Sequence, residues 1–357
     1  AIADDKYMFE VMGRLWALGA TIDWDQIWGD ARRVRVPLPT YAFQRSRDFI
    51  EPGKATAETA PQFLMRSDDV AGWGWKPVWR PRSAQVEIDV ADLRDADPQT
   101  WLVFADEAGL AAGVIAQLRG AGQQVVEVRV GDTFSRRSDE LYQISPERGR
   151  EGYDLLLQDL AARGVIPTRI AHFWLVTADE GHRPGSSFFH RVQEQGFYAL
   201  MFLAQALADE GTAKPHITVV TNGAAKLRDE ALTHPAKATI AGPARVIPRE
   251  LPGVTVATLD VQLPRVEKVS IWNRAKVQSA QSAAMQTLTS RVLEELLAEP
   301  ADLAAALRAD RRFECAMKPV ALDAAPAAKT GGTYLITGGF GGIGLSLAQD
   351  FAAHGAN

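Results

Sequence analysis

The sequence predicts an α/β protein built around a mainly parallel sheet, followed by the start of a second unit of the same class. Between residues 101 and 259, short apolar segments alternate with segments of helical periodicity. Strands separated by helices of this length form βαβ units, whose strands run parallel. Apolar runs such as 217–220 are typical of strands covered on both faces. Near residue 340, a glycine-rich turn joins one more apolar segment to one more helical segment.

The N-terminal part of the chain is predicted to be only partly regular. Residues 2–18 have apolar side chains at helical spacing, and a short extended piece should begin at Asp23. The two prolines within 37–45 remove backbone donors and fix φ, so this segment should be extended and irregular. Residues 51–60 have the composition of a linker.

The region after this linker contains the predicted sheet. Tryptophans between residues 73 and 79 indicate a strand, which Pro77 confines to a sheet edge or to its first residues. The next predicted strands are 101–105, 125–130, 172–177, 216–221 and 254–259, and the predicted helices are 108–118, 153–162, 188–208 and 290–298. Residues 311–317 alternate as a half-exposed strand does, and 323–332 is a second linker.

Composition excludes several classes of function. A net charge of −5 gives no reason to expect nucleic acid or an anionic membrane as partner. No apolar run approaches the roughly 20 residues that cross a bilayer, and no secretory leader is visible. Cys315 is the single cysteine, and the six histidines lack ligand spacing, so neither a disulfide nor a metal site is expected. We therefore expect a cytoplasmic protein.

The glycine-rich turn is the motif that carries chemistry. Thr333–Thr337 has a buried-strand pattern, and Leu345–Ala353 is helical. Between them lies G-x-G-x-x-G, formed by Gly339, Gly341 and Gly344. The motif is specific when a strand precedes it and a helix follows. The residues expected to contact a dinucleotide are Thr337, Gly338, Gly339, Phe340, Gly341, Gly342, Ile343 and Gly344.

Each feature of this turn has a physical role in binding a pyrophosphate. The glycines allow a tight turn out of the strand, close approach of the backbone to the ligand, and close packing of helix and strand. The helix then offers unpaired N–H groups and its positive dipole end to the phosphates. The sequence therefore predicts the opening of a dinucleotide-binding Rossmann fold, which the chain does not complete.

An internal comparison separates this unit from the earlier one. Residues 101–110 also read as strand, turn and helix, but Asp106 and Glu107 stand where the later unit has its first glycines. Carboxylates repel a phosphate, so we interpret the earlier unit as a scaffold copy without ligand.

The residue that selects NAD or NADP should lie about 20 residues past the glycines. That position falls at or beyond Asn357, so the selection stays open.

With these residues laid out, the chain resembles a stretch of a modular type I polyketide synthase. Pro37–Arg45 looks like the linker that follows the acyltransferase, although Ala42 stands where the family usually has proline. Phe9–Trp24 is similar to the last helix and exit of the acyltransferase. Trp75–Pro81 resembles the opening strand of the ketoreductase structural subdomain, and Thr337–Gly344 resembles the cofactor loop of its catalytic subdomain.

The resemblance implies a domain order and an activity. The implied parts are the acyltransferase end (1–30), its linker (31–72), a truncated Rossmann-like, short-chain-dehydrogenase-like structural subdomain (73–322), a linker (323–332) and the first strand–helix unit of the catalytic subdomain (333–357). The parent would reduce a β-ketoacyl thioester on an acyl carrier protein with NADPH. The family's catalytic Lys, Ser, Tyr and Asn have no counterpart here, so we expect this chain alone to be inactive.

The resemblance also implies partners, and two alternative interpretations stay open. The implied partners are the acyl carrier protein, the neighbouring ketosynthase and acyltransferase domains, the rest of the ketoreductase, and a second copy of the parent in a homodimer. In one alternative, the chain is a non-catalytic scaffold or docking segment with a vestigial nucleotide loop. In the other, it belongs to a free-standing short-chain reductase, which leaves segment 37–45 unexplained.

Overall fold

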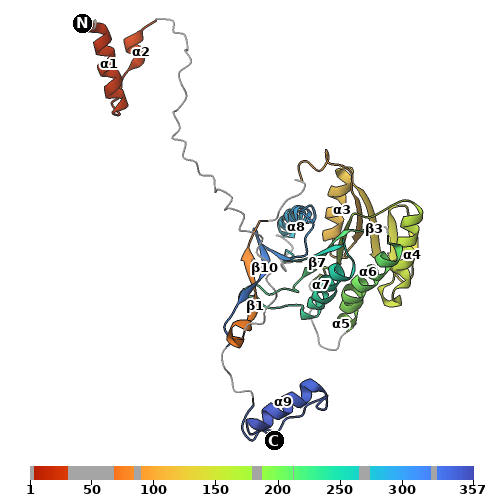
Figure 1. Cartoon of the computed structure of the whole chain (residues 1–357). Coiled ribbons are helices and arrows are strands. Elements are labelled where there is room, and N and C mark those ends of the chain that lie inside the picture. The colour runs from red at the N-terminus through yellow and green to blue at the C-terminus, as the bar shows by residue number, and fades with distance from the viewer. Residues whose placement is uncertain are drawn as a thin grey trace, which may run out of the picture. The chain divides into compact units, whose positions relative to one another are not determined.

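The computed structural model describes residues 4–30, 68–83, 90–178, 187–211, 213–264, 274–322 and 328–357, without the side chains of 274–276. The chain divides into two compact units, Ala1–Arg66 and Ser67–Asn357 (Figure 1). The predicted irregular segment 37–45 and the linker 51–60 lie outside the described residues.

The first unit contains two helices, α1 (Asp4–Ala17) and α2 (Trp24–Trp28). The helix predicted over 2–18 is confirmed over residues 4–17. The extended piece predicted at Asp23 is wrong, because Asp23 is the N-cap of α2. Its carboxylate accepts the backbone N–H of Gln26 at 3.1 Å, which satisfies a donor that the helix itself leaves unpaired.

The second unit is built on a ten-stranded sheet with the order β1-β10-β9-β8-β7-β6-β2-β3-β5-β4 (Figure 1). In this order, every neighbouring pair of strands from β9 to β5 is parallel. The pairs β1–β10, β10–β9 and β5–β4 are antiparallel. The strands are β1 (Trp75–Pro81), β2 (Thr100–Phe104), β3 (Gln124–Val130), β4 (Ser135–Ser138), β5 (Leu141–Ile144), β6 (Arg169–Leu175), β7 (His216–Asn222), β8 (Thr255–Val261), β9 (Ala304–Arg308) and β10 (Arg311–Pro319).

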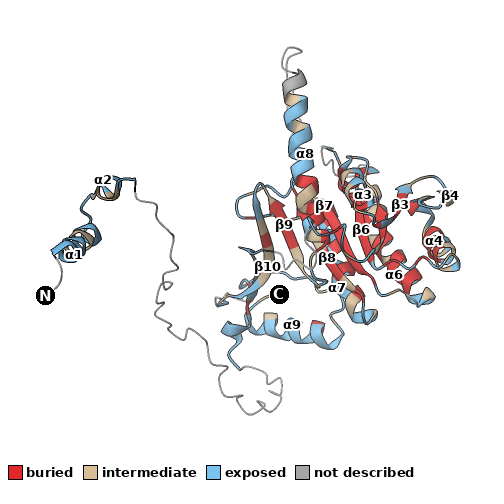
Figure 2. Cartoon of the chain, turned by 90° about the horizontal axis from the view of Figure 1, so that it is seen from above, coloured by how far each residue is buried: buried red, intermediate tan, exposed pale blue. Residues whose placement is uncertain are grey.

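Helices cover both faces of the parallel part and enclose one core on each face. Side chains of α3 and α8 pack on one face, and side chains of α4, α6 and α7 pack on the other. The central strands are buried along most of their length (Figure 2). The helices are α3 (Leu110–Gly120), α4 (Glu151–Ala162), α5 (Ser187–Val192), α6 (Ala199–Glu210), α7 (Ala241–Glu250), α8 (Arg274–Leu296) and α9 (Gly342–Ala353).

The strand order is that of a truncated Rossmann-like fold. From β2 the chain runs outward to β3 and β5, then returns to β6 and continues through β7, β8 and β9. The topological switch point therefore lies between β2 and β6. Between β3 and β5, the strand β4 takes the place of a crossover helix, which shortens the fold on that side. The predicted α/β class with a mainly parallel sheet is confirmed.

Several sequence predictions for this unit need correction. The strand predicted over 333–337 is not formed, and Leu335 is 94% exposed, because no strand pairs with this segment in the described chain. The helix predicted over 290–298 is the last part of the much longer α8. The helix predicted over 188–208 is interrupted by the π-helical turn Gln193–Tyr198. The edge position that Pro77 predicts is confirmed, since β1 is an outermost strand.

Candidate nucleotide-binding site

The glycine turn before α9 folds into a compact loop. Gly338 has φ of 71°, a conformation that side-chain-bearing residues rarely adopt. Its carbonyl accepts the N–H of Gly341 at 2.9 Å, which closes the turn. Gly341 itself is extended, with φ of −78° and ψ of 162°, and α9 begins at the next residue. Two of the predicted glycines thus fix how the chain enters the helix.

Gly344 lies where the helix packs against the loop. A Cβ at this position would lie 2.3 Å from the carbonyl oxygen of Gly338 and 2.8 Å from Cα of Gly339. Both atoms belong to the backbone, so no side chain can rotate away. By contrast, a Cβ on Gly342 would meet nothing within 4 Å. Close approach of helix and loop therefore requires glycine at 344 and leaves position 342 sterically free.

The N-terminus of α9 has the features of an anion-binding site. The first intrahelical hydrogen bond runs from Leu345 N–H to Gly341 O at 2.8 Å, and no side chain caps the helix. The N–H groups of Gly342, Ile343 and Gly344 thus precede the first intrahelical bond, and the helix dipole favours an anion beside them. Among the predicted site residues, only Gly344 is buried, and α9 is exposed along most of its length (Figure 2). These residues fit a pyrophosphate.

The corresponding position in the earlier unit is occupied by the protein's own carboxylate. Asp106 accepts the N–H of Leu110 at 3.2 Å and that of Ala111 at 2.7 Å, at the start of α3. Burial raises the pKa of Asp106, and these backbone hydrogen bonds oppose the rise. Glu107 is exposed. The sequence comparison was right that carboxylates replace the glycines, and the structure shows that Asp106 alone takes the anion's place.

Aromatic side chains fill the interior beside the switch point. The ring of Phe104, at the end of β2, lies 4.9 Å from the ring of His172 and 5.1 Å from that of Trp174, both on β6. Tyr153 of α4 packs on Phe104 from a ring distance of 6.4 Å. All four side chains are buried.

A buried lysine joins the carboxyl ends of β6 and β7. The ammonium group of Lys237 donates to Thr177 Oγ1 at 2.8 Å and to Asn222 Oδ1 at 2.6 Å. The side chain of Asn222 also pairs with the backbone of Thr177, accepting its N–H and donating to its carbonyl. This group could not be found from sequence, because nothing in the local sequence around Lys237 signals burial.

We expect Asp106→Ala to lower the free energy of unfolding by about 0.5–2 kcal/mol, the range for losing a helix cap. Glu107→Ala, at the exposed neighbour, should change it by less than about 0.5 kcal/mol.

Because burial raises the pKa of Asp106, its contribution to stability is full at acidic pH and declines as pH rises through the folded pKa. Urea unfolding of wild type and Asp106→Asn between about pH 3 and 7 should show this decline only in the wild type. Parallel curves of stability against pH for the wild type and Asp106→Asn would contradict this prediction.

Comparison with known proteins agrees with this architecture. A family model described as "Beta-ketoacyl synthase-like, N-terminal" matches residues 99–276. The chain is 27% identical to the pikromycin polyketide synthase component PikAII of Streptomyces venezuelae and 26% identical to the erythronolide synthase EryA3 of Saccharopolyspora erythraea. Each alignment covers 97% of this chain but only 8% or 9% of the relative, so the chain spans a small part of these proteins.

Solved structures share the fold. A multidomain structure of a keto acid-selecting NRPS module, with adenylation, ketoreductase and pseudo Asub domains, superposes with a TM-score of 0.61 at 24% identity. The match covers 79% of this chain and 22% of the NRPS chain. An N-terminal ketoreductase from the macrolactin assembly line gives 0.56 at 17% identity, covering 79% of this chain and 52% of its own.

The strand order gives this protein a truncated Rossmann-like fold, which it shares with these ketoreductase structures. Over 97% of its length, the chain is similar to segments of the polyketide synthases PikAII and EryA3. In the described part of the chain, no helix is both long and apolar enough to span a membrane, and no cluster of potential metal ligands occurs.

Proposed function

We propose that this chain supports the NADPH-dependent reduction of a β-ketoacyl thioester, held on an acyl carrier protein, to the β-hydroxy form. The observation that carries the proposal is the contrast between two helix N-termini of one chain. The start of α9 is open and lacks a side-chain cap, whereas Asp106 fills the start of α3. Of these two turns, the α9 turn is the one open to a dinucleotide phosphate.

The described residues would contribute binding and positioning. The N–H groups of Gly342, Ile343 and Gly344 would hold the pyrophosphate, and the turn at Gly338 would fix their direction. NADPH supplies the hydride when bound. The sheet of residues 73–322 would act as the structural subdomain, and 333–357 as the first part of the catalytic one. The neighbouring ketosynthase, acyltransferase and carrier domains, and a second copy of the synthase, would complete the assembly.

We expect Gly344→Val to weaken NADPH binding by at least about tenfold, measured by nicotinamide fluorescence in the synthase polypeptide that contains this chain. The added Cβ would overlap the carbonyl of Gly338, and relieving such overlap costs about 1–3 kcal/mol and distorts the loop. Gly342→Ala is the matched control, because its Cβ meets no atom within 4 Å. Equal affinities of Gly344→Val and wild type would refute the proposed site.

A second candidate function is a purely structural one, in which the α9 turn is vestigial. Asp106 and the aromatic cluster favour such a role for the sheet itself. The two functions differ in the same titration, since a vestigial turn predicts no NADPH binding by the wild-type synthase.

With a β-ketoacyl thioester and NADPH, we expect the 357-residue chain alone to give no turnover. Measurable turnover would contradict our assignment.

A further inference from the structure

One face of the two-stranded ribbon of β1 and β10 carries three exposed cations, Lys76, Arg80 and Lys318. The pairing places Lys76 opposite Lys318, Val78 opposite Ala316, and Arg80 opposite Glu314. This face also carries Arg312, whose register partner Leu307 belongs to the core beneath α8. Trp79 points to the other face, where it packs near Phe313. The face that carries the three cations therefore lies on the α8 side of the sheet.

This face is basic and carries a narrow apolar strip. We call Lys76, Val78, Arg80, Ala316 and Lys318 the basic shelf. Its three cations are exposed, and they form no ion pair with any described residue. Val78 and Ala316 are half-buried between them. The whole chain has a net charge of −5, so this concentration of unpaired positive charge is local.

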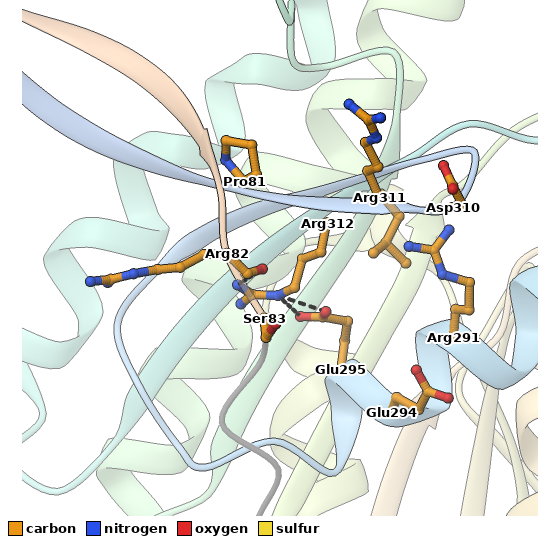
Figure 3. A pocket seen from close by; sticks show the side chains of 10 residues that line it. Pro81, Arg82, Ser83, Arg291, Glu294, Glu295, Asp310, Arg311 and Arg312 are labelled. Atoms are coloured by element: carbon orange, nitrogen blue, oxygen red, sulfur yellow. Dashed lines mark hydrogen bonds and ion pairs between the residues drawn. The ribbon is translucent and has the colours of Figure 1, made fainter. Parts of the chain in front are cut away.

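A groove continues from the end of the shelf toward α8. It encloses about 710 Å³ between the end of β1, the start of β10 and α8 (Figure 3). The ion pair between Arg312 and Glu295 lies in this groove, with Arg82 and Arg291 to either side. Glu314, the carboxylate opposite Arg80 on the same face, is already paired with Arg82 and Arg312. The positive shelf cations therefore stay available to a ligand.

The outer edge of β1 is poorly suited to another strand. The N–H of Arg82 donates to Arg312 O at 3.3 Å, so the even-numbered residues of β1 bond to β10. The odd-numbered positions face outward, and two of them are Pro77 and Pro81, which have no N–H. A partner is therefore expected on the face of the ribbon and not at its edge.

We infer that the basic shelf docks an acidic amphipathic helix of a partner protein. Elsewhere in this sheet, helices cover the faces, and a helix on the shelf would extend the layer of α3 and α8. Its apolar stripe would contact Val78 and Ala316, and carboxylates beside the stripe would meet Lys76, Arg80 and Lys318. This surface is separate from the α9 turn and goes beyond the proposed reduction.

The test is binding of a synthetic acidic amphipathic helix of about 18 residues, measured by fluorescence anisotropy on the full chain. We expect the combined change Lys76→Glu, Arg80→Glu and Lys318→Glu to weaken binding by at least about tenfold at low salt. The control combination is Arg94→Glu, Lys226→Glu and Arg249→Glu, at exposed cations elsewhere in the same unit, and it should leave binding nearly unchanged. Unchanged circular dichroism would verify that both variants fold.

Four outcomes would overturn the inference: no binding by the wild type, equal loss in the control variant, equal binding of a peptide with lysine in place of glutamate, and equal binding of a scrambled peptide of the same charge. Shelf-dependent binding to phosphatidylserine vesicles without peptide binding would assign the surface to a membrane and also reject it. None of these readouts involves NADPH, so the result is independent of the α9 turn.

Discussion

Arg312→Ala is expected to lower the free energy of unfolding by about 3–5 kcal/mol, the range for breaking a buried ion pair by removing one partner. The guanidinium donates through Nε to both carboxylate oxygens of Glu295, at 2.7 and 2.9 Å. Both side chains are only 9% exposed. Arg312 also donates to the carbonyl of Arg82 and to Glu314, so it joins α8, β10 and the end of β1.

The size of this effect depends on the carboxylate left behind. Burial raises the pKa of Glu295, and Arg312 opposes that rise, so without Arg312 a buried charge loses its partner. Arg311→Ala is the matched control, because Arg311 is the exposed neighbour in the same strand and should cost less than about 0.5 kcal/mol. Combining Arg312→Leu with Glu295→Met should recover much of the loss, since apolar residues can replace a buried pair. Similar urea midpoints for Arg312→Ala and Arg311→Ala would show that the pair contributes little.

His172→Met is expected to flatten the acid limb of the stability curve. His172 is fully buried, and burial lowers its pKa from 6.5 to about 3. The unfolded chain therefore takes up the proton first, so the contribution of His172 is present above pH 6.5 and is lost as pH falls toward 3. At about 1.4 kcal/mol per pH unit, the wild type should lose about 3 kcal/mol at this site between pH 6.5 and 4.

At neutral pH the same substitution should cost little. Neither ring nitrogen of His172 has a hydrogen-bond partner within the described structure, so methionine replaces an unsatisfied polar ring with an apolar chain. Phe173→Met, at the adjacent buried position of β6, is the control and should shift stability equally at every pH. Urea unfolding at several pH values measures both. If the His172→Met curve ran parallel to the wild type, titration of His172 would not govern the acid limb.

Local pattern was enough for the parts of this fold whose neighbours are close in sequence. Alternating apolar and helical segments predicted the parallel sheet, because a βαβ unit encodes its own layers. Pro77 predicted an edge strand, since proline has no donor for a second neighbour. The glycine motif predicted a close helix at Gly344, which the structure shows, whereas the left-handed turn lies at Gly338, one residue before the motif.

Elements that depend on distant partners could not be predicted in this way. β9, with the sequence Ala-Ala-Ala-Leu-Arg, has no strand signal of its own and forms because β8 and β10 pair with it. Residues 333–337 do have a strand signal, yet no strand forms there, although Tyr334 N–H donates to Asn357 O at 3.2 Å. Burial of Lys237 and the joining of Arg312 to Glu295 likewise depend on side chains from separate elements.

The sequence by itself determined the class of fold, the edge strand and the position of the glycine turn, because each depends on backbone chemistry within a few residues. Only the tertiary structure decided which helix N-terminus stays open, which charges are buried in pairs and which cations β1 and β10 bring together on one face. These properties depend on which distant groups the fold brings into contact, and local sequence does not encode such contacts.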